Sequence, residues 1–180
     1  MRKVVSSLFY SLDGVVEAPD QWSMEYFDAD MMADMQSQID MIDTVLLGRV
    51  SYEEWAGYWP TSTDEPFASF INKVPKHVVT SRLEKADWQN TTLIKGDLTE
   101  AITRLKGQPG KNIGVNASPT LVASLVELDL LDELRLYVYP VIVGKGRQLF
   151  ANGPKMKHLK LVETHTTGSG VVALVYHRVQ

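Results

Sequence analysis

Cysteine is absent from the 180 residues, which excludes disulfide bonds and thiolate metal sites and fits a reducing compartment. The four histidines are scattered without a metal-binding spacing, so we expect no metal ion. No apolar run reaches the roughly 18 residues of a membrane-spanning helix, and the basic start lacks the apolar stretch of a signal peptide. These absences predict a cytoplasmic protein with no membrane partner.

Positive charge is also scarce. Lysine and arginine number 18 against 22 aspartates and glutamates, and the net charge of −4 argues against a nucleic-acid partner. Three patterns of common enzyme and nucleotide sites are missing as well, namely GxSxG, GxxxxGK[ST] and GxGxxG. The sequence therefore contains neither a nucleophilic serine motif nor a standard phosphate loop.

What remains is an ordinary globular composition, with 44% hydrophobic and 22% charged residues. No repeat, linker or shift in composition divides the chain, so we predict a single domain over residues 1–180. Strand and helix patterns alternate through the first two thirds, and strands dominate the last third. This order predicts an α/β fold of three layers (αβα), with a mainly parallel central sheet and an antiparallel C-terminal hairpin.

Hydrophobic periodicity and turn residues predict the individual elements. Strands are expected at 3–12, 44–48, 77–81, 91–95, 112–116 and 130–144, the last interrupted at Pro140. Helices are expected at 28–42, 49–59, 97–107 and 118–127, with Asp97 and Glu100 at capping-box spacing. A loop is expected at 60–66, and a C-terminal hairpin at 159–179 around Gly168-Ser169-Gly170.

Ligands of open α/β sheets bind where the strands end, and four such corners carry polar or small residues. In the first corner, Gly48 ends a strand, Arg49 adds a positive charge, and Ser51 offers a hydroxyl at a helix start. Such a set suits a phosphate, although it also describes a glycine turn with a surface arginine and a helix cap.

The second corner contains Thr80, Ser81 and Arg82. Two hydroxyls and a guanidinium could hold the 2′-phosphate that separates NADP from NAD, or could simply form a solvated loop. In the third corner, Ser118 and Pro119 suit the N-cap and the first position of a helix. The free amides of that helix could face a pyrophosphate, but a purely structural connection is an equally good interpretation.

The fourth corner follows the first strand. Asp13 and Gly14 mark a turn, and Trp22 in the loop beyond could wall a planar ligand or simply pack. Asp28 begins the next helix on its apolar face, where an acid is unusual. It is either the helix N-cap or a pocket carboxylate that holds or protonates a nitrogen heterocycle. Solvent exposure is expected for two further acids of this helix, Asp30 and Asp34.

Four segments in order carry a family resemblance, namely SLDGVVEAP, DTVLLGRVSYE, VVTSR and SPTLVASLVELDLLDELRLYVYPVIVGKGRQLF. Together they resemble the dihydrofolate-reductase-like superfamily over nearly the whole chain. The branch they resemble most includes the reductase domain of the riboflavin-biosynthesis deaminase–reductase. The resemblance implies a central sheet of mainly parallel strands with NADPH bound across the strand ends.

The resemblance also implies roles for individual residues. The implied cofactor-binding residues are Gly48, Arg49, Ser51, Thr80, Ser81, Arg82, Asn116, Ala117, Ser118, Pro119 and Thr120. The implied substrate-side residues are Leu12, Asp13, Gly14 and Trp22, and Asp28 matches an acidic helix start that supplies a pocket carboxylate. One departure is that the superfamily usually has a glycine pair at the turn before this helix, where this chain has Ala117-Ser118-Pro119. A Cβ at Ala117 would crowd the cofactor or resist a positive φ.

The sequence is therefore expected to encode an NADPH-dependent reductase. It would transfer hydride to a C=N or C=O bond of a small heterocyclic or sugar-linked substrate, with Asp28 as the catalytic polar anchor or proton source. Two alternatives are a non-catalytic NADP(H)- or ligand-binding protein of the same fold and an interaction domain without nucleotide. A homodimer is also expected, because the long apolar C-terminal strands would leave an edge that proteins usually cover.

Overall fold

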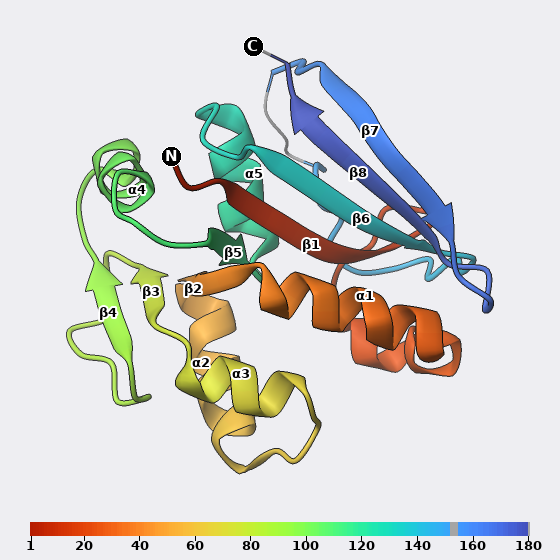
Figure 1. Ribbon diagram of the computed structural model, residues 1–180, viewed down its shortest axis with the longest axis horizontal. Coiled ribbons are helices and arrows are strands. Elements are labelled where there is room, and N and C mark those ends of the chain that lie inside the picture. The colour runs from red at the N-terminus through yellow and green to blue at the C-terminus, as the bar shows by residue number, and fades with distance from the viewer. Residues whose placement is uncertain (152–154, 180) are drawn as a thin grey trace.

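The computed structural model describes residues 1–151 and 155–179, and its centre is an eight-stranded sheet with helices on both faces (Figure 1). Across the sheet the strands lie in the order β4-β3-β2-β5-β1-β6-β8-β7. All pairings from β4 to β6 are parallel, whereas β8 is antiparallel to both of its neighbours. The strands are β1 (Val4–Ser11), β2 (Ile42–Gly48), β3 (Lys76–Val79), β4 (Thr91–Ile94), β5 (Asn112–Val115), β6 (Glu133–Tyr139), β7 (Leu159–Thr166) and β8 (Val172–Arg178).

Helices cover the sheet in two layers (Figure 1). One layer contains α4 and α5, whose apolar residues form one core with β1, β2 and β5. The other contains α1, α2 and α3, which pack on the opposite face in two further clusters. The helices are α1 (Ala29–Asp40), α2 (Arg49–Tyr58), α3 (Phe67–Lys73), α4 (Leu98–Lys106) and α5 (Pro119–Glu127), with 3-10 turns η1 (Pro19–Gln21), η2 (Met24–Tyr26) and η3 (Trp59–Thr61). The predicted three-layer α/β fold is confirmed.

Strand β2 illustrates why the sequences of the central strands are continuous apolar runs. Leu46 faces α4 and α5, whereas Val45 and Leu47 face α2 and α3, and all three are fully buried. A parallel strand covered on both faces needs apolar residues at every position rather than at every second one.

Helix α4 shows how local sequence sets the element boundaries. The Asp97 side chain accepts a hydrogen bond from the Glu100 amide (2.8 Å), as the predicted cap requires. Ala101, Ile102 and Leu105 recur at helical spacing and are buried against the sheet, and the helix ends at Gly107. The helix between β4 and β5 thus has a defined start and end.

Several expected boundaries were wrong. The strand expected at 130–144 is β6, which covers only Glu133–Tyr139, because Pro140 cannot donate to a strand ladder. Helix α3 was missed, since its seven residues are too few to show a clear period. The helix expected at 28–42 is α1, which begins after Asp28 and ends at Asp40, with Met31 as its buried residue.

Within the described ranges, none of the helices combines the length and the apolar character needed to cross a bilayer.

Candidate functional site

The fold brings the predicted corners to one edge of the sheet. Strands β1 to β6 are mutually parallel, so the residues that follow β1, β2, β3 and β5 lie along their shared carboxyl edge. Strands β2 and β5 are neighbours, yet the chain leaves them toward opposite faces, into α2 and α5 (Figure 1). Such a switch point is where open α/β sheets bind their ligands.

Two side-chain hydrogen bonds join the corners after β2 and β5. The Gly48 amide donates to Ser118 Oγ (2.9 Å), and the Ser51 hydroxyl donates to the Ala117 carbonyl. Ser118 and Ser51 are nearly buried, at 3% and 7% exposure. The start of α2 is therefore fastened to the turn before α5, and four of the predicted cofactor residues lie in one place.

The turn before α5 keeps a glycine-like backbone without a glycine. Ala117 has φ of 47°, in the left-handed region that glycine adopts most readily. Ser118 follows as the helix N-cap and Pro119 as the first helical residue, as predicted, although the Ser118 hydroxyl bonds to Gly48 and not to its own helix. Ala117 therefore adopts the positive φ that its Cβ was expected to disfavour.

Two arginines lie in or next to this corner. The Arg49 guanidinium, at the first residue of α2, forms an ion pair with Glu53 one turn later (2.6 Å). Gly48 is level with Val79 in the ladder, so the segment after β3 comes next along the edge. There the Thr80 oxygen accepts from the Arg82 amide (3.1 Å), while the Arg82 side chain is exposed.

These groups fit the phosphates of the implied NADPH. The first-turn amides of α2 and α5 have no partners within their own helices, and the positive helix ends favour anions. Arg49, Arg82 and the Ser118 hydroxyl add donors beside them. The hydroxyls of Ser51 and Thr80 already have partners within the protein. Ser51 donates to the Ala117 carbonyl, and Thr80 accepts from the Arg82 amide.

On the other side of β5, Asp13 in the corner after β1 connects this corner to the loop after β6, a set of contacts that we call the Asp13 brace. Asp13 accepts hydrogen bonds from the Ser11 hydroxyl and from the amides of Val143 and Gly144, at 2.7, 3.1 and 2.8 Å. The hydrogen bond from Ser11, with those from the two amides, lowers the pKa of Asp13 to about 2. Gly14 has φ of 84°, and a Cβ there would come within 3.0 Å of the Tyr10 hydroxyl. Leu12, by contrast, is 60% exposed at this edge.

Asp28 is the N-cap of α1. One carboxylate oxygen accepts from the Met31 amide (2.9 Å), and the other accepts from the Ser169 amide in the β7–β8 turn (2.7 Å). The Met31 amide bond and those from Ser169 lower the pKa of Asp28. The side chain is therefore ionised at neutral pH and holds α1 to the hairpin. Its catalytic role stays a prediction.

Two other acids of α1 make the same connection. Asp30 accepts from the Gly168 amide (2.8 Å), and Asp34 pairs with His165 of β7 (2.7 Å). Asp30 is exposed, as expected, although it also binds the hairpin. The expected exposure of Asp34 was wrong, because its side chain is only 21% exposed beside His165, which lies 131 residues away along the chain.

Under α1, the structure adds residues that the sequence did not single out. Tyr137 and Tyr139 of β6 are buried, and the hydroxyls of both have no hydrogen-bond partner among the described residues. Burial raises the pKa of Tyr137 to about 12 and raises the pKa of Tyr139 as well, an effect that the nearby Ser23 hydroxyl partly opposes. Trp22 packs edge-on against Tyr139 with ring centroids 5.4 Å apart, and its role as a wall of a ligand site stays a prediction. Alternation along β6 was the only sequence signal for the two tyrosines.

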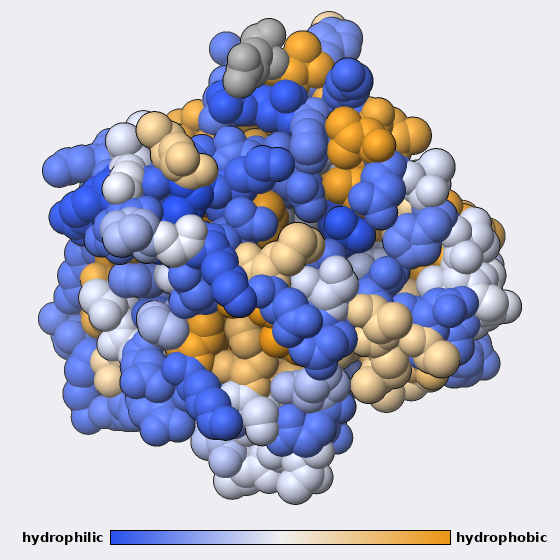
Figure 2. All heavy atoms as spheres, in the orientation of Figure 1, coloured by the Kyte–Doolittle hydropathy of each residue, from blue (hydrophilic) through white to orange (hydrophobic). Residues whose placement is uncertain are grey.

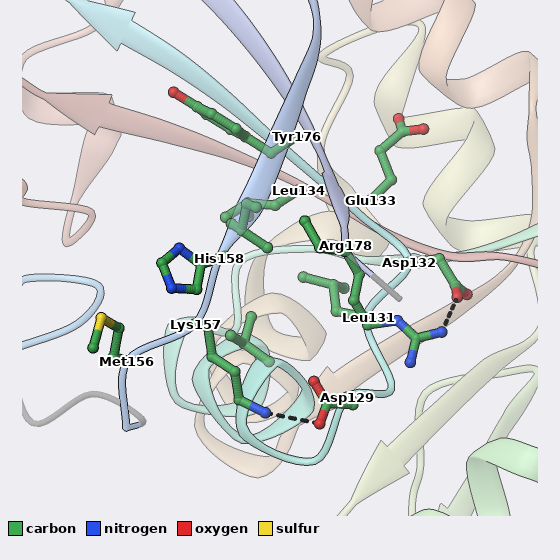
Figure 3. Close-up of a pocket in the computed structure, with 13 residues that line it drawn as sticks. Asp129, Leu131, Asp132, Glu133, Leu134, Met156, Lys157, His158, Tyr176 and Arg178 are labelled. Atoms are coloured by element: carbon green, nitrogen blue, oxygen red, sulfur yellow. Dashed lines mark hydrogen bonds and ion pairs between the residues drawn. The ribbon is translucent and has the colours of Figure 1, made fainter.

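Two cavities lie elsewhere. One of about 220 Å³ is at the opposite edge, where β6 and β7 begin (Figure 3). Ion pairs join Lys157 to Asp129 (2.8 Å) and Arg178 to Asp132 (3.8 Å) beside it. The other, of about 660 Å³, lies between α2 and the segment before β4. Neither is lined by a predicted site residue, so the candidate site is defined by topology and by its donor groups.

Comparisons with known proteins agree with this architecture. Residues 2–173 match the family model of the RibD C-terminal domain. The chain is 32% identical to the uncharacterized protein YyaP of Bacillus subtilis (strain 168), over 98% of this chain and 95% of that protein.

Solved structures share the fold at low identity. A putative riboflavin biosynthesis protein from Shewanella sp. PV-4 superposes with a TM-score of 0.78 at 18% identity, covering 99% of both chains. Dihydrofolate reductase from Enterococcus faecalis, complexed with NADP(H), superposes with a TM-score of 0.61 at 14% identity, covering 99% of this chain and 97% of the reductase. The fold is thus of the reductase type, and the chain belongs to the RibD C-terminal domain family.

Proposed function

We propose that the protein is an NADPH-dependent reductase of a small heterocyclic or sugar-linked substrate, of the 5-amino-6-(5-phosphoribosylamino)uracil or dihydrofolate type. The observation that carries the proposal is the joined corner at the β2/β5 switch point, where Ala117 keeps the left-handed turn in place of glycine. The protein would act as a single domain over residues 1–180 in the cytoplasm.

In this proposal the cofactor lies across the carboxyl edge. Arg82 and Ser81 bind the 2′-phosphate, while Arg49 and the first-turn amides of α2 and α5 bind the pyrophosphate. When bound, NADPH supplies the hydride, so the protein's own contribution is position and charge. The E. faecalis reductase, which has this fold, was solved with NADP(H), and this supports the choice of cofactor.

The substrate would approach from the Leu12–Gly14 side, beneath Trp22 and the start of α1. Asp28 would act there as a fixed negative anchor, because its lowered pKa leaves it without a proton at neutral pH. A water molecule would then supply the proton to the reduced bond. The Asp13 brace would hold the loop that borders the nicotinamide.

A second candidate is a non-catalytic NADP(H)- or ligand-binding protein of the same fold. The aromatic cluster favours it, because Phe9, Trp22, Tyr26 and Tyr139 pack ring against ring where a substrate would enter. In that case the cofactor would bind but no substrate would be reduced.

Titration with NADPH, followed by tryptophan and cofactor fluorescence, tests the proposal. We expect saturable binding that Arg82→Ala weakens at least about tenfold, because a charged hydrogen bond to phosphate is lost. The same change should leave NADH binding almost unaltered. Arg104→Ala, which removes an exposed arginine from α4, is the matched control.

Absence of saturable binding would exclude both the reductase and the binding protein. Where binding is found, NADPH oxidation is then measured with pteridine and aminopyrimidine substrates. Oxidation of none of them, beside tight binding, would favour the non-catalytic candidate.

A further inference from the structure

Four buried polar groups lie together beneath α1. Within the described ranges, five buried side-chain polar atoms have no hydrogen-bond partner, and four of them are the hydroxyls of Ser23, Tyr137 and Tyr139 and the Nε of Arg135. These residues are 1%, 3%, 0% and 7% exposed. Buried polar atoms are nearly always hydrogen-bonded, so four exceptions in one place need a common explanation.

Strand β6 sets the direction of this set, which we call the polar row. Arg135, Tyr137 and Tyr139 alternate along the strand and therefore point to one face, which α1 covers. Tyr139 is level with Ser11 at the carboxyl end of β1, whereas Arg135 is level with Ser7, nearer the amino end. The polar row thus runs inward from the edge that carries the candidate site.

The outer end of the polar row reaches the surface. The Asp34 carboxylate is close enough to Tyr137 to raise its pKa, and it pairs with His165 of β7 at 2.7 Å. The side chains of Asp34 and His165 are 21% and 36% exposed. The face on which α1 meets the β7–β8 hairpin is mainly hydrophilic (Figure 2), so solvent reaches this pair. A carboxylate–imidazole pair in contact with solvent can take up and release protons.

The inner end of the polar row lies at the start of α1. Tyr139 has the Ser23 hydroxyl and the Asp28 carboxylate near it. Asp28 already accepts hydrogen bonds from the amides of Met31 and Ser169. The hydroxyls of Ser23 and Tyr139 have no such partners among the described residues, and they can therefore hold a water molecule here.

Both tyrosines keep their protons at neutral pH. Burial raises the pKa of Tyr137 to about 12, while Asp34 and Glu163 add to the rise and Arg135 opposes it. Burial also raises the pKa of Tyr139. A neutral hydroxyl donates one hydrogen bond while it accepts another, so a proton can pass along the row without either tyrosine becoming an anion.

We propose that ordered water bridges the polar row, and that protons pass along it from the Asp34–His165 pair to the carboxyl edge of the sheet. Side chains at alternate positions of a strand are about 7 Å apart, a gap that one or two hydrogen-bonded water molecules span. This inference rests on the proposed reductase function, and it identifies the residues that would hold and resupply the water that protonates the substrate.

The proton balance of the route is simple. For each hydride added to carbon, the water held by Ser23 and Tyr139 gives one proton to the nitrogen or oxygen of the reduced bond. That water regains a proton from the Tyr139 hydroxyl, which takes one from Tyr137 through the next water. The outer end of the row recovers the proton from solvent at His165. Water is therefore the acid, and the serine and the two tyrosines are positioning residues.

Thermal unfolding tests the hydrated row without cofactor or substrate. Tyr137→Phe and Tyr139→Phe each remove a hydroxyl that binds water, so each should lower Tm by about 3 °C. Dry hydroxyls predict the opposite, because phenylalanine removes a buried polar atom without a partner and Tm would rise. Tyr176→Phe is the matched control and should leave Tm unchanged, since that tyrosine packs on the opposite face of the sheet.

Isotope effects on NADPH oxidation test the proton route. Tyr137→Phe interrupts the row away from the substrate, so proton delivery should limit the rate. We expect kcat to fall at least about tenfold with KM unchanged. The solvent deuterium isotope effect on kcat should rise, and the effect of deuterium at the nicotinamide should fall. A merely structural fault would not shift the two isotope effects in opposite directions, and Tyr176→Phe should alter neither.

NADPH binding, measured by fluorescence, separates failure of this inference from failure of the proposed function. Without binding, the reductase is excluded and the proton route with it, whereas the Tm values still decide whether the row is hydrated. With binding, unchanged isotope effects in Tyr137→Phe would overturn the route, as would the absence of any reduction. Tm values of both row variants at or above that of the wild type would overturn the hydrated row itself.

Discussion

Ala117 adopts a left-handed conformation that costs an L-residue roughly 1–2 kcal/mol. Glycine has no such cost there, but its unfolded chain is more flexible, which offsets part of the gain. We therefore predict that Ala117→Gly raises the free energy of unfolding by about 0.5–1 kcal/mol. Urea denaturation monitored by circular dichroism measures this change, and NADPH affinity should be retained.

Ala123, in the middle of α5, provides the matched control for this prediction. Its backbone is helical, so Ala123→Gly should lower stability by about 1 kcal/mol. Equal destabilisation by both substitutions would mean that Ala117 is not strained.

Lys76 is fully buried at the start of β3, where its ammonium donates to the carbonyls of Ile71 and Val74 at 2.8 and 3.0 Å. Burial lowers its pKa from 10.5 to about 8. Between these values the unfolded chain binds more protons than the folded one, so stability must rise with pH. We predict a rise of roughly 2 kcal/mol in the free energy of unfolding from pH 8 to pH 10.

Denaturation curves at several pH values check this slope. Lys76→Met should remove it, whereas Lys73→Met, three residues earlier and exposed, should leave it unchanged. The denaturation curves are compared only up to pH 10. Above that pH the raised pKa of Tyr137 lowers the free energy of unfolding, because the unfolded chain loses this proton more readily than the folded one.

Residue roles were predictable from sequence only where the chemistry is local. Capping by Asp97 and the positions of Ser118 and Pro119 follow from neighbours one turn away. The bonds of Asp30 and Asp34 to the hairpin, and the burial of Tyr139, depend on segments more than a hundred residues distant or on the far side of the sheet. Such contacts leave no periodic signal in the chain.

At the scale of elements, long periodic segments were predicted well and short ones poorly. Helix α4 and the hairpin of β7 and β8 lie where expected, since each has a clear period and a turn or cap. Helix α3, which has only seven residues, was not predicted, and β6 ends at Tyr139, before the expected boundary. The apolar run around β6 starts in the buried loop residues Leu130 and Leu131 and continues past the strand to Ile142, which is 75% exposed. Hydrophobicity alone therefore does not mark the ends of the strand.

Asp28 joins two elements, α1 and the β7–β8 hairpin, and its substitution should act on both. Asp28→Ala removes the N-cap and the acceptor of the Ser169 amide, so we expect Tm to fall by about 3 °C. Because its folded pKa is lowered, the stabilisation is present above about pH 4 and is lost as the pH falls further. Differential scanning calorimetry at neutral and acidic pH measures the difference from wild type.

Asp20→Ala, in the exposed turn before α1, serves as the control and should leave Tm unchanged at both pH values. The pH profile of NADPH oxidation separates an anchor from a proton source. A profile that keeps its shape in Asp28→Asn agrees with the anchor, whereas loss of its acidic limb would assign the proton to Asp28.

For the whole molecule, the sequence order of strands and helices predicts a parallel sheet but not the order of its strands. The chain returns from β4 at the edge to insert β5 between β2 and β1, and this return creates the switch point. Consequently α2 and α5, which begin on opposite faces, share one junction through Gly48 and Ser118. A ligand at the junction would contact both helical layers and would stabilise the molecule as a unit.

This coupling predicts a cofactor-dependent shift in thermal unfolding. NADPH at about a hundred times its dissociation constant should stabilise the fold by about 2.7 kcal/mol and raise Tm by roughly 5–10 °C. NADH at the same concentration should give a smaller shift, because it lacks the 2′-phosphate proposed to bind Arg82. Arg82→Ala should make the two shifts equal, while Arg104→Ala preserves the difference. Equal shifts from NADPH and NADH in the wild-type protein would remove Arg82 from the proposed cofactor site and leave the helix amides, Arg49 and the Ser118 hydroxyl as its phosphate donors.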